Sequence, residues 1–564
     1  SMKNNVRNYF IFLICAICSF MCLSVGCKAA VDNWKLSVSD VTLNSGEEVV
    51  VEVLSFPGGA LEWRSCDESI CTVTSIIGAN SARICALASG ETTVYVKAEG
   101  QETKVDVKVR KVRLSTAVTT GKATVNMDEG QRRVDLGIYV ENGSLEDVRF
   151  STDNWLVAEA DRNGVVTAYA PGSATITAMH RGGASIDIDI QVIGTQKEQK
   201  EYPKTVFSGG WDSGHVQGIA IDTEGEYMYY TFTETFVKTD LEGNIIGSVI
   251  GYDGHLGDCT FNRSDGRVYA SLTLATDEYN WTDKYAAYIA IIDVDKITRI
   301  GMDCWEEGIM TTVNLKEFTA DYFVDIDGDG TIANGASSPD HRYGVWGIDG
   351  LAFGPRFGES LKGGQYLTVA YAIGKNESRI DNDYQVFLQY DVSDWAQYEM
   401  PLQSYAPHQS GPDEPDGKYF LYTGNTNFGV QTMDYDRDRN MWVCIVYNYA
   451  KSANGPKKDF DANTTFLIDN SVKPYLVNLE GQAESQQGNL LSFVKGGLYN
   501  EKKDIYSWRF WMGNTGFISL GNGYYYVSHS GTTAEGLSTT TVTLYRYTGS
   551  TNLDANANDL FEIV

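Results

Sequence analysis

The sequence predicts an all-β protein in which two small β-sandwich domains precede a five-bladed β-propeller. Two observations carry this prediction. A hairpin pattern, made of a short polar lead-in and two alternating strands around a Gly or Asp turn, recurs five times between residues 211 and 530. A shorter β pattern with its own turn spacing occurs twice within residues 34–193.

Residues 1–30 match a secretory signal peptide. A basic lead-in precedes an apolar run over residues 9–25, which is too short and wrongly flanked for a membrane-spanning helix. Residues 23–27 resemble a bacterial lipobox, so two alternatives stay open. Either Cys27 is acylated and becomes a lipid anchor, or ordinary cleavage occurs near Ala29. Both alternatives predict an extracellular or cell-surface protein.

Residues 34–110 and 113–193 are two copies of one small all-β unit. Each copy has a Gly after an early strand, a central Trp-x-Ser or Phe-Ser element, and a late strand of the pattern Gly-x-(Ala or Thr)-Thr-(Ile or Val). These features resemble the bacterial Ig-like domains of group 2. The resemblance implies an Ig-like β-sandwich, and such modules usually serve as spacers or adhesive stalks.

A polar linker over residues 194–203 separates these units from the predicted propeller over residues 204–564. Two further strands follow each hairpin, most clearly at residues 236–241 and 245–249. Four antiparallel strands repeated radially make a β-propeller. The five hairpins are expected at residues 215–222 with 227–232, 255–262 with 267–272, 347–353 with 365–371, 429–436 with 441–447, and 514–520 with 524–529.

Composition excludes several classes of function. The formal net charge of −29 argues against nucleic-acid binding, which needs a basic face. The cysteines outside the signal are too sparse for a disulfide scaffold, although one pair among Cys66, Cys71 and Cys85 could bridge. We expect a glycan as partner, no nucleic-acid or protein partner, and a monomer.

Five of the six histidines lie in the predicted propeller, all in loops assigned to one face. Long loops gathered on one face mark a functional face. Imidazole is a common metal ligand and titrates near neutral pH. His255 and Asp258, three residues apart at the start of one inner strand, form the sharpest candidate pair for binding a metal or activating water. The alternative is that these polar side chains close hydrogen bonds between blades.

The positions equivalent to Asp258 in other blades carry Gln217, Asp349, Gln431 and Thr515, and such a ring can bind a metal or sugar hydroxyls. Exposed aromatic residues beside polar rings often stack on sugar faces. The predicted substrate-binding residues are therefore Gln217, Trp346, Asp349, Asn425, Gln431, Trp511 and His529.

The segment Asp325-x-Asp327-x-Asp329-Gly satisfies the first half of a calcium-binding loop. The twelfth position holds Ala336 rather than Glu, which excludes a complete EF-hand. The sequence therefore predicts a structural calcium ion held by Asp325, Asp327 and Asp329, and no catalytic role for that loop.

The propeller segments 213–218 and 254–258 resemble the five-bladed propeller domain of gut-bacterial N-acetylgalactosamine deacetylases that act on the blood group A antigen. The resemblance implies a metal-dependent hydrolase that removes acetyl from a 2-acetamido sugar. It assigns catalysis to Asp258, His255 and His408. It assigns a divalent ion, Mn, Zn or similar, to His215, His255 and Asp258, and Glu234 is a further acidic candidate.

Two other classes of function stay open. A propeller-type polysaccharide lyase or glycosidase is one, but a lyase should present Arg or Lys to a uronate, and the predicted functional face holds few cations beyond Arg342 and Arg379. A non-catalytic glycan-binding adhesin is the other, and it would suit the Ig-like units and the aromatic loops.

Overall fold

The structure, a computed structural model, describes residues 34–196, 200–274, 286–333, 338–374, 379–403, 407–424, 429–446, 465–482, 485–508, 510, 512–549 and 560–564. The predicted signal peptide, including Cys27, lies outside the described residues. The chain divides into two compact units, described separately below. The first comprises residues 1–113, 140–144 and 180–184; the second comprises residues 114–139, 145–179 and 185–564.

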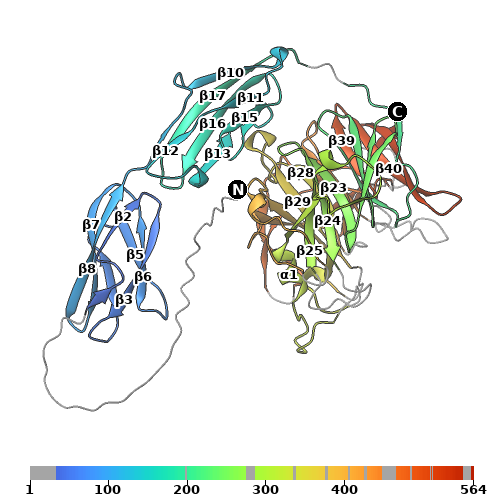
Figure 1. The fold of residues 1–564 in the computed structure, drawn as a ribbon. Helices are drawn as coiled ribbons and strands as arrows, with labels where there is room; N and C mark the ends of the chain where they lie inside the picture. Colours follow the sequence, from blue (N-terminus) through green and yellow to red (C-terminus); the bar gives the residue numbers. More distant parts are fainter. Residues whose placement is uncertain are drawn as a thin grey trace. The chain divides into compact units, whose positions relative to one another are not determined.

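The first unit contains a sandwich of two four-stranded sheets (Figure 1). Buried residues of both sheets, among them Val51, Ile84 and Val107, form one apolar core. The prediction of a small β-sandwich at residues 34–110 agrees with these sheets. One sheet has the order β1 (Lys35–Leu36), β3 (Glu48–Ser55), β6 (Ser81–Ala86) and β5 (Cys71–Ser75); the other has β2 (Asp40–Asn44), β8 (Gln101–Arg110), β7 (Gly90–Ala98) and β4 (Glu62–Ser65).

The second sandwich repeats the strand order of the first. In both, the main sheet pairs an early strand in parallel with the last strand, β2 with β8 and β10 with β17. This shared topology supports two copies of one unit. The sheets are β10 (Lys122–Asn126), β17 (Ser185–Ile193), β16 (Gly172–His180) and β13 (Val148–Thr152); β11 (Arg133–Asp135), β15 (Val165–Ala168) and β14 (Ala158–Ala160); and the pair β12 (Tyr139–Glu141) and β9 (Arg113–Ser115).

Five further sheets, numbered I to V, form most of the rest of the second unit. Sheet I is β19 (Val216–Ile221), β20 (Tyr227–Phe232), β21 (Phe236–Asp240), β22 (Ile245–Ile250) and β26 (Met302–Asp303). Sheet II is β23 (His255–Asn262), β24 (Arg267–Leu274), β25 (Ala286–Ile292) and β27 (Met310–Asn314). Sheet III is β28 (Val345–Gly354), β29 (Tyr366–Ile373), β30 (Tyr384–Tyr390), β31 (Gly417–Tyr422), β36 (Gln487–Leu490) and β35 (Tyr475–Asn478). Sheet IV is β32 (Val430–Asp436), β33 (Met441–Val446) and β34 (Thr465–Asp469). Sheet V is β18 (Thr205–Phe207), β41 (Ser538–Tyr547), β40 (Tyr524–Thr532) and β39 (Phe517–Gly521), with β42 (Phe561–Ile563) beside β41.

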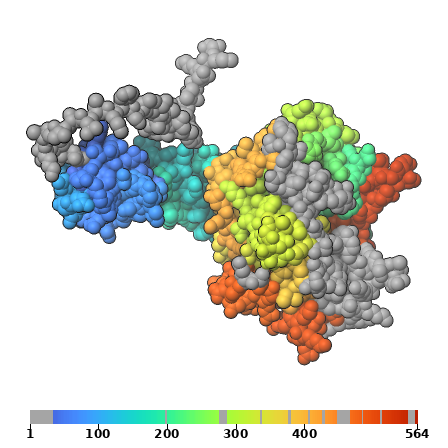
Figure 2. Space-filling model, turned by 90° about the horizontal axis from the view of Figure 1, so that it is seen from below, coloured from blue at the N-terminus to red at the C-terminus, as the bar shows by residue number. Residues whose placement is uncertain are grey.

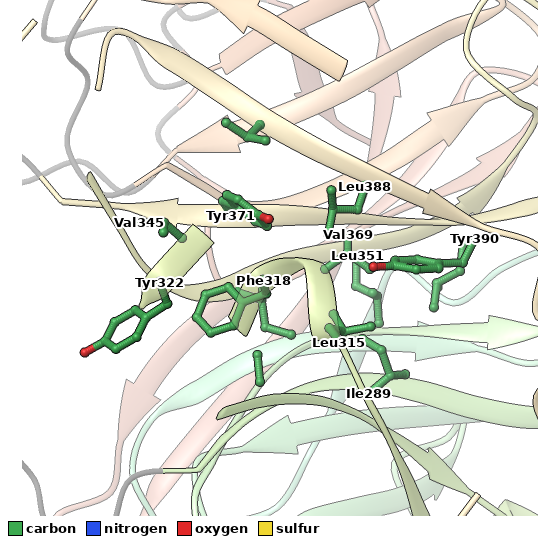
Figure 3. Packing of buried hydrophobic residues seen from close by; sticks show 14 of the residues in the cluster. Ile289, Leu315, Phe318, Tyr322, Val345, Leu351, Val369, Tyr371, Leu388 and Tyr390 are labelled. Atoms are coloured by element: carbon green, nitrogen blue, oxygen red, sulfur yellow. The ribbon is translucent and has the colours of Figure 1, made fainter. Parts of the chain in front are cut away.

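The first strand of each sheet contacts the first strand of the next. Contacts join β19 to β23, β23 to β28, β28 to β32, β32 to β39, and β39 back to β19. Separate apolar cores fill the spaces between successive sheets, in the same cyclic order. Figure 3 shows buried residues of the core between sheets II and III, among them Leu351, Tyr371 and Leu388, with Ile289 beside Leu315.

All five predicted hairpins are present, at β19–β20, β23–β24, β28–β29, β32–β33 and β39–β40. The expectation of four strands per repeat is only partly met, because the five sheets differ in strand number. The fourth strand of sheet V is β18, which pairs with β41 more than 300 positions later in the chain. Sequence periodicity did not reveal this pairing, since β18 is only three residues long.

A short helix, α1 (Lys316–Tyr322), follows sheet II and was not expected from the sequence. Its buried residues Phe318 and Tyr322 are four positions apart, so they share one helix face. That face packs on the core between sheets II and III (Figure 3). A hairpin of β37 (Leu498–Asn500) and β38 (Ile505–Ser507) lies near β34 of sheet IV. In the described part of the chain, no helix combines the length and the apolar character needed to span a membrane.

Candidate functional site

Polar residues stand at β-bulges in the first strands of sheets I to IV. A bulge inserts an extra residue into one strand of a pair and redirects its side chain, and bulges are common beside active sites. The sequence predicted that these residues occupy equivalent positions of the repeats, and the strand-pairing registers agree with that prediction. The residues at the register shifts are Gln217 in β19, Asp258 beside Gly257 in β23, Asp349 beside Gly350 in β28, and Gln431 in β32.

Asp258 joins three of the sheets through backbone hydrogen bonds. The N–H of Cys259 donates to Oδ1 at 3.0 Å, and the N–H groups of Leu351 in β28 and Met433 in β32 donate to Oδ2 at 3.1 and 3.3 Å. The strand β19 also approaches Asp258 closely, since a Cβ added to its Gly218 would lie 2.6 Å from Asp258 Oδ1. Burial raises the pKa of Asp258 well above its usual range. Both carboxylate oxygens are therefore engaged in holding strands together.

Asp349, a half-buried acid, stands at the bulge of β28. Burial raises the pKa of Asp349 to about 8, and a hydrogen bond from Gln431 lowers it by less. At neutral pH this carboxyl group is mostly protonated and can donate a hydrogen bond. Ser271 of β24 donates to the backbone carbonyl of Asp349 at 2.9 Å, which fixes the bulge.

His215 and His255 lie together at the beginnings of β19 and β23. Burial lowers the pKa of the half-buried His255, the nearby charge of His215 lowers it further, and Glu234 raises it. The turn at Thr233 links the two histidines, because the Thr233 carbonyl accepts the N–H of Leu256 at 3.2 Å and its hydroxyl lies 3.5 Å from the His215 carbonyl.

The remaining polar groups around His215 are already partnered. The side-chain nitrogen of Gln217 lies 3.4 Å from each ring nitrogen of His215. Glu234 accepts hydrogen bonds from the Ser213 hydroxyl at 2.9 Å and the Gly214 N–H at 2.7 Å. The arrangement offers two adjacent imidazoles, the half-buried one favouring its neutral form, and an exposed carboxylate.

The predicted metal set of His215, His255 and Asp258 does not come together as three ligands. Among the described residues, the one group of three or more His, Cys, Asp or Glu side chains with ligand atoms within 4.8 Å of one another is Asp325, Asp327 and Asp340. The physical reason is the bulge in β23, which turns Asp258 toward the amides of β28 and β32.

His408 lies apart from His255, contrary to the catalytic grouping that the resemblance implied. Its Nε2 lies 2.7 Å from the hydroxyl of Thr312 in β27, and its Nδ1 accepts the N–H of Ser410 at 3.1 Å. Its partners Thr312 and Tyr288 lie on β27 and β25, the fourth and third strands of sheet II, whereas His255 begins the first strand. His408 secures the outer edge of the sheet.

The remaining predicted substrate-binding residues are dispersed. His529 in β40 lies 2.9 Å from the hydroxyl of Tyr545, and Trp346 is half-buried at a second register shift in β28. Thr515, from the predicted ring, precedes β39 and lies 3.2 Å from the hydroxyl of Ser528. Asn425 and Trp511 lie outside the described residues.

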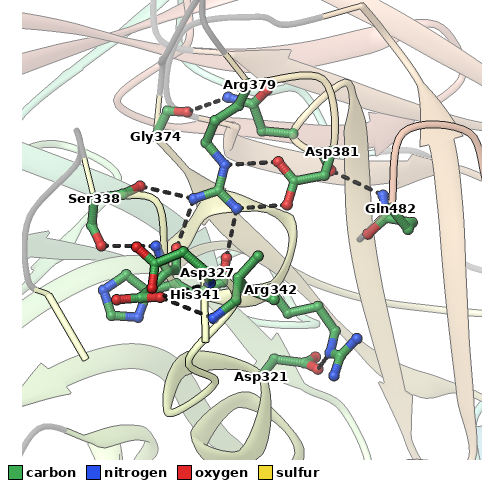
Figure 4. A network of polar contacts seen from close by, with 12 residues as sticks. Asp321, Asp327, Ser338, His341, Arg342, Gly374, Arg379, Asp381 and Gln482 are labelled. Atoms are coloured by element: carbon green, nitrogen blue, oxygen red, sulfur yellow. Dashed lines mark hydrogen bonds and ion pairs between the residues drawn. The ribbon is translucent and has the colours of Figure 1, made fainter. Parts of the chain in front are cut away.

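Two of the three predicted calcium ligands lie close together in the structure. Asp325 and Asp327 meet Asp340, a residue that the motif did not contain, whereas Asp329 accepts hydrogen bonds from Thr331 at 2.7 and 2.8 Å. Figure 4 shows Arg379 beside this loop, bonded to Asp381 and to the carbonyls of Ser338 and His341. In Figure 2 the yellow-green segment that contains α1 and this loop lies on the surface.

A cavity of about 280 Å³ lies at the other ends of the first strands, and sequence reasoning did not find it. Residues of β19, β23, β28, β32 and β39 all line it, together with Trp155 and Leu156 of the second sandwich. Of its charged lining residues, Asp222, Arg263 and Arg437 directly follow β19, β23 and β32, and Asp434 lies within β32. The turns on this side are short, which is why the sequence directed attention to the opposite face.

A sequence model of the bacterial Ig-like domain (group 2) family matches residues 109–185. This match confirms the Ig-like resemblance for the second sandwich, and domains of this class are typical of extracellular and surface proteins. No curated protein matches the chain.

Several solved structures align with parts of the chain. Domains 5–6 of the S-layer protein SbsC share 18% identity, with 29% of this chain and 98% of theirs covered and a TM-score of 0.13. The I9–I11 tandem from titin shares 10% identity, with 48% and 99% covered and a TM-score of 0.19. A C-terminal fragment of intimin shares 14% identity, with 34% and 69% covered and a TM-score of 0.16. Such low scores define neither fold nor function.

Proposed function

We propose that sheets I to V are the five blades of a β-propeller that forms the catalytic part of a secreted carbohydrate-active enzyme. The cyclic contacts of the five first strands and the five separate cores between successive sheets support this architecture. The pairing of β18 with β41 supports it as well, because it joins both ends of the five-sheet region within one sheet.

The reaction proposed is hydrolytic deacetylation of a 2-acetamido sugar such as N-acetylgalactosamine on host glycans. The observation that carries it is the nearness of His215 and His255 at the beginnings of β19 and β23, two of the four first strands with polar residues at bulges. His255, whose pKa lies below its usual range, is neutral at pH 7 and can accept a proton from water. The water oxygen attacks the acetamide carbonyl, the C–N bond breaks, and the imidazolium returns the proton to the leaving amine, giving acetate and the free amino sugar.

Other residues near the first strands are proposed to support this chemistry. Asp349, protonated at neutral pH because burial raises its pKa to about 8, can donate a hydrogen bond to the oxyanion that develops on the carbonyl. Gln217, Gln431, Trp346 and His529 remain the proposed contacts to the sugar. Asp258 acts by positioning the first strands rather than by accepting the water proton.

The divalent ion expected from the resemblance does not fit the described donor set. Both oxygens of Asp258 accept backbone N–H groups, and Glu234 is occupied by Ser213 and Gly214. The proposed reaction therefore uses no metal ion. The experiment below tests whether acetate release requires one. A structural calcium ion at Asp325, Asp327 and Asp340 is proposed separately.

The experiment is acetate release from glycans ending in N-acetylgalactosamine or N-acetylglucosamine, with and without a chelator. Acetate from one sugar class, undiminished by the chelator, supports the metal-free deacetylation. Acetate that disappears with the chelator would support the deacetylase but contradict the metal-free step. No acetate from any glycan would reject the proposed reaction.

A glycan-binding adhesin is the second candidate, favoured by the Ig-like family match at residues 109–185. An adhesin should bind the same glycans without releasing acetate, so binding measured beside acetate release separates the two. Both candidates place the protein outside the cell or on its surface, in line with the predicted signal peptide.

A further inference from the structure

The cavity at the far ends of the first strands has an unusual charge arrangement. It contains two guanidinium groups, Arg263 and Arg437, and two carboxyl groups, Asp222 and Asp434. At about 280 Å³ it is slightly smaller than the roughly 300–1,000 Å³ typical of drug-sized ligands, which suits a molecule the size of a monosaccharide.

Arg263 is held rigidly at the cavity wall. Its guanidinium carbon lies 3.4 Å from the ring centre of Trp155 and 3.6 Å from that of Tyr169, and its NH2 group donates to the Trp155 carbonyl at 2.7 Å. All these groups belong to the second compact unit. The Nε–H of Arg263 is buried and has no hydrogen-bond acceptor among the described residues. Because this Nε–H is closed to solvent, Arg263 offers the cavity a fixed positive charge rather than a free hydrogen-bond donor.

Arg437 is the complementary, unrestrained cation. It is exposed, and its guanidinium group lies over Gly521 at the end of β39, where an added Cβ would come within 2.6 Å of NH2. Burial lowers the pKa of Arg263 to about 10, and the charge of Arg437 lowers it further, so the two groups are near each other. Among the described residues, neither arginine forms an ion pair.

The cavity's carboxyl groups are engaged elsewhere. Asp222 accepts the N–H groups of Glu226 at 2.6 Å and Tyr227 at 2.9 Å. Asp434 accepts the N–H of Ser519 at 2.6 Å. Burial raises the pKa of both acids, to about 7 for Asp434, which reduces their negative charge at neutral pH. Since Asp434 is about half ionised at pH 7, the two arginines carry more charge than the two acids of the lining, although Asp434 lies near Arg437 and Glu159 lies near Arg263.

We propose that this cavity binds a monosaccharide-sized ligand carrying a carboxylate, such as a hexuronic acid. Arg437 supplies the planar two-donor fork that matches a carboxylate, and Arg263 supplies a fixed positive charge. Trp155 and Tyr202 provide aromatic walls for the body of the ligand. The site lies at the opposite strand ends from His215 and His255, so it is independent of the proposed deacetylation.

Titration calorimetry of the purified protein with glucuronate, glucose and inorganic phosphate tests this proposal. We expect glucuronate to bind and glucose to bind at least about tenfold more weakly, because glucose lacks the charged group. Arg437→Gln should weaken glucuronate binding at least about tenfold. Arg546→Gln is the matched control, since Arg546 is an exposed arginine that pairs with Glu562 outside the cavity.

Three results would overturn the assignment. These are no glucuronate binding by the wild-type protein, equal affinity for glucose and glucuronate, and an unchanged glucuronate affinity in Arg437→Gln. Phosphate binding as tight as glucuronate binding would replace the carboxylate by a general oxyanion and would also contradict the proposal. Acetate release measured on the same variants separates this site from the proposed catalytic function, which Arg437 does not touch.

Discussion

Asp258 shows how a single side chain can look catalytic in sequence and act structurally in the fold. Its spacing from His255 suggests a metal-binding or water-activating pair, but its two oxygens accept N–H groups from β23, β28 and β32. A buried acceptor that satisfies several backbone donors is costly to remove, because each donor left unpaired carries a desolvation penalty.

Replacing Asp258 by Asn should therefore destabilise the second unit. The amide retains one acceptor oxygen and turns a donor toward the amides, so we expect a loss of about 1–3 kcal/mol in the free energy of unfolding. Urea unfolding measures the change. Asp212→Asn, at an exposed position, should change stability by less than about 0.5 kcal/mol. Equal stability of Asp258→Asn and the wild type would show that these hydrogen bonds contribute little.

Asp349 should make the stability of the protein depend on pH. Its pKa is about 8 in the folded state against 3.8 as the usual value, so the folded state binds more protons than the unfolded state between those limits. The stabilising effect of the neutral carboxyl is complete below about pH 4 and is lost as the pH rises toward and through 8. In Asp349→Asn the fall in unfolding free energy between pH 6 and 9 should be smaller than in the wild type. An identical fall in both proteins would rule out Asp349 as its source.

At the scale of elements, β18 connects the beginning of the five-sheet region to its last sheet. Val206 is 1% exposed and belongs to the core between sheets V and I, whereas Phe207 is 50% exposed. Val206→Ala should lower the free energy of unfolding by about 1–2 kcal/mol, because it removes two buried methyl groups.

Phe207→Ala is the matched control for β18. Its side chain faces outward, so its removal should cost less than about 0.5 kcal/mol. Chemical unfolding of both variants compares them directly. If Phe207→Ala lowers the free energy of unfolding as much as Val206→Ala does, then β18 does not pack as described.

The loop that begins at Asp325 is expected to respond to calcium. Asp325, Asp327 and Asp340 supply oxygen ligands of the kind that calcium prefers, and binding to the folded state alone raises stability. Calcium should raise the midpoint of thermal unfolding by at least about 2 °C in the wild type. The shift should vanish in Asp340→Asn.

Asp329→Asn provides the contrast for this loop, since Asp329 bonds Thr331 rather than joining the three acids. This variant should keep the calcium shift. Loss of the shift in Asp329→Asn, or no shift in the wild type measured by differential scanning fluorimetry, would argue against the three-acid site.

At the scale of the whole molecule, the repeated hairpins could be predicted because their alternation is local. The strands from Val216 and His255 begin within a residue of where period-two patterning placed them. The pairing of β18 with β41 could not be predicted, since a three-residue strand gives no periodic signal and its partner is distant in sequence. The family match at residues 109–185 adds independent support for one of the two sandwiches.

The candidate site was predictable only in part. His215 and His255 precede equivalent strands of adjacent repeats, so their meeting follows from the repeat itself. The position of His408 depends on the path of a long connection, which carries it to the outer edge of sheet II. The direction of Asp258 depends on a bulge, and bulges leave little trace in a single sequence.

The most direct test of the proposed reaction compares acetate release by the wild type, His255→Gln and His408→Gln. The substrate is the glycan that the wild type deacetylates. His408 is a matched control, because it is also half-buried, its pKa is also lowered by burial, and it bonds Thr312 at the outer edge of sheet II. His255→Gln should lose about 10²–10⁴-fold in rate, the usual contribution of general acid–base catalysis, while His408→Gln should stay near the wild-type rate. A wild-type rate in His255→Gln, or no acetate from any glycan, would contradict the proposed role of His255.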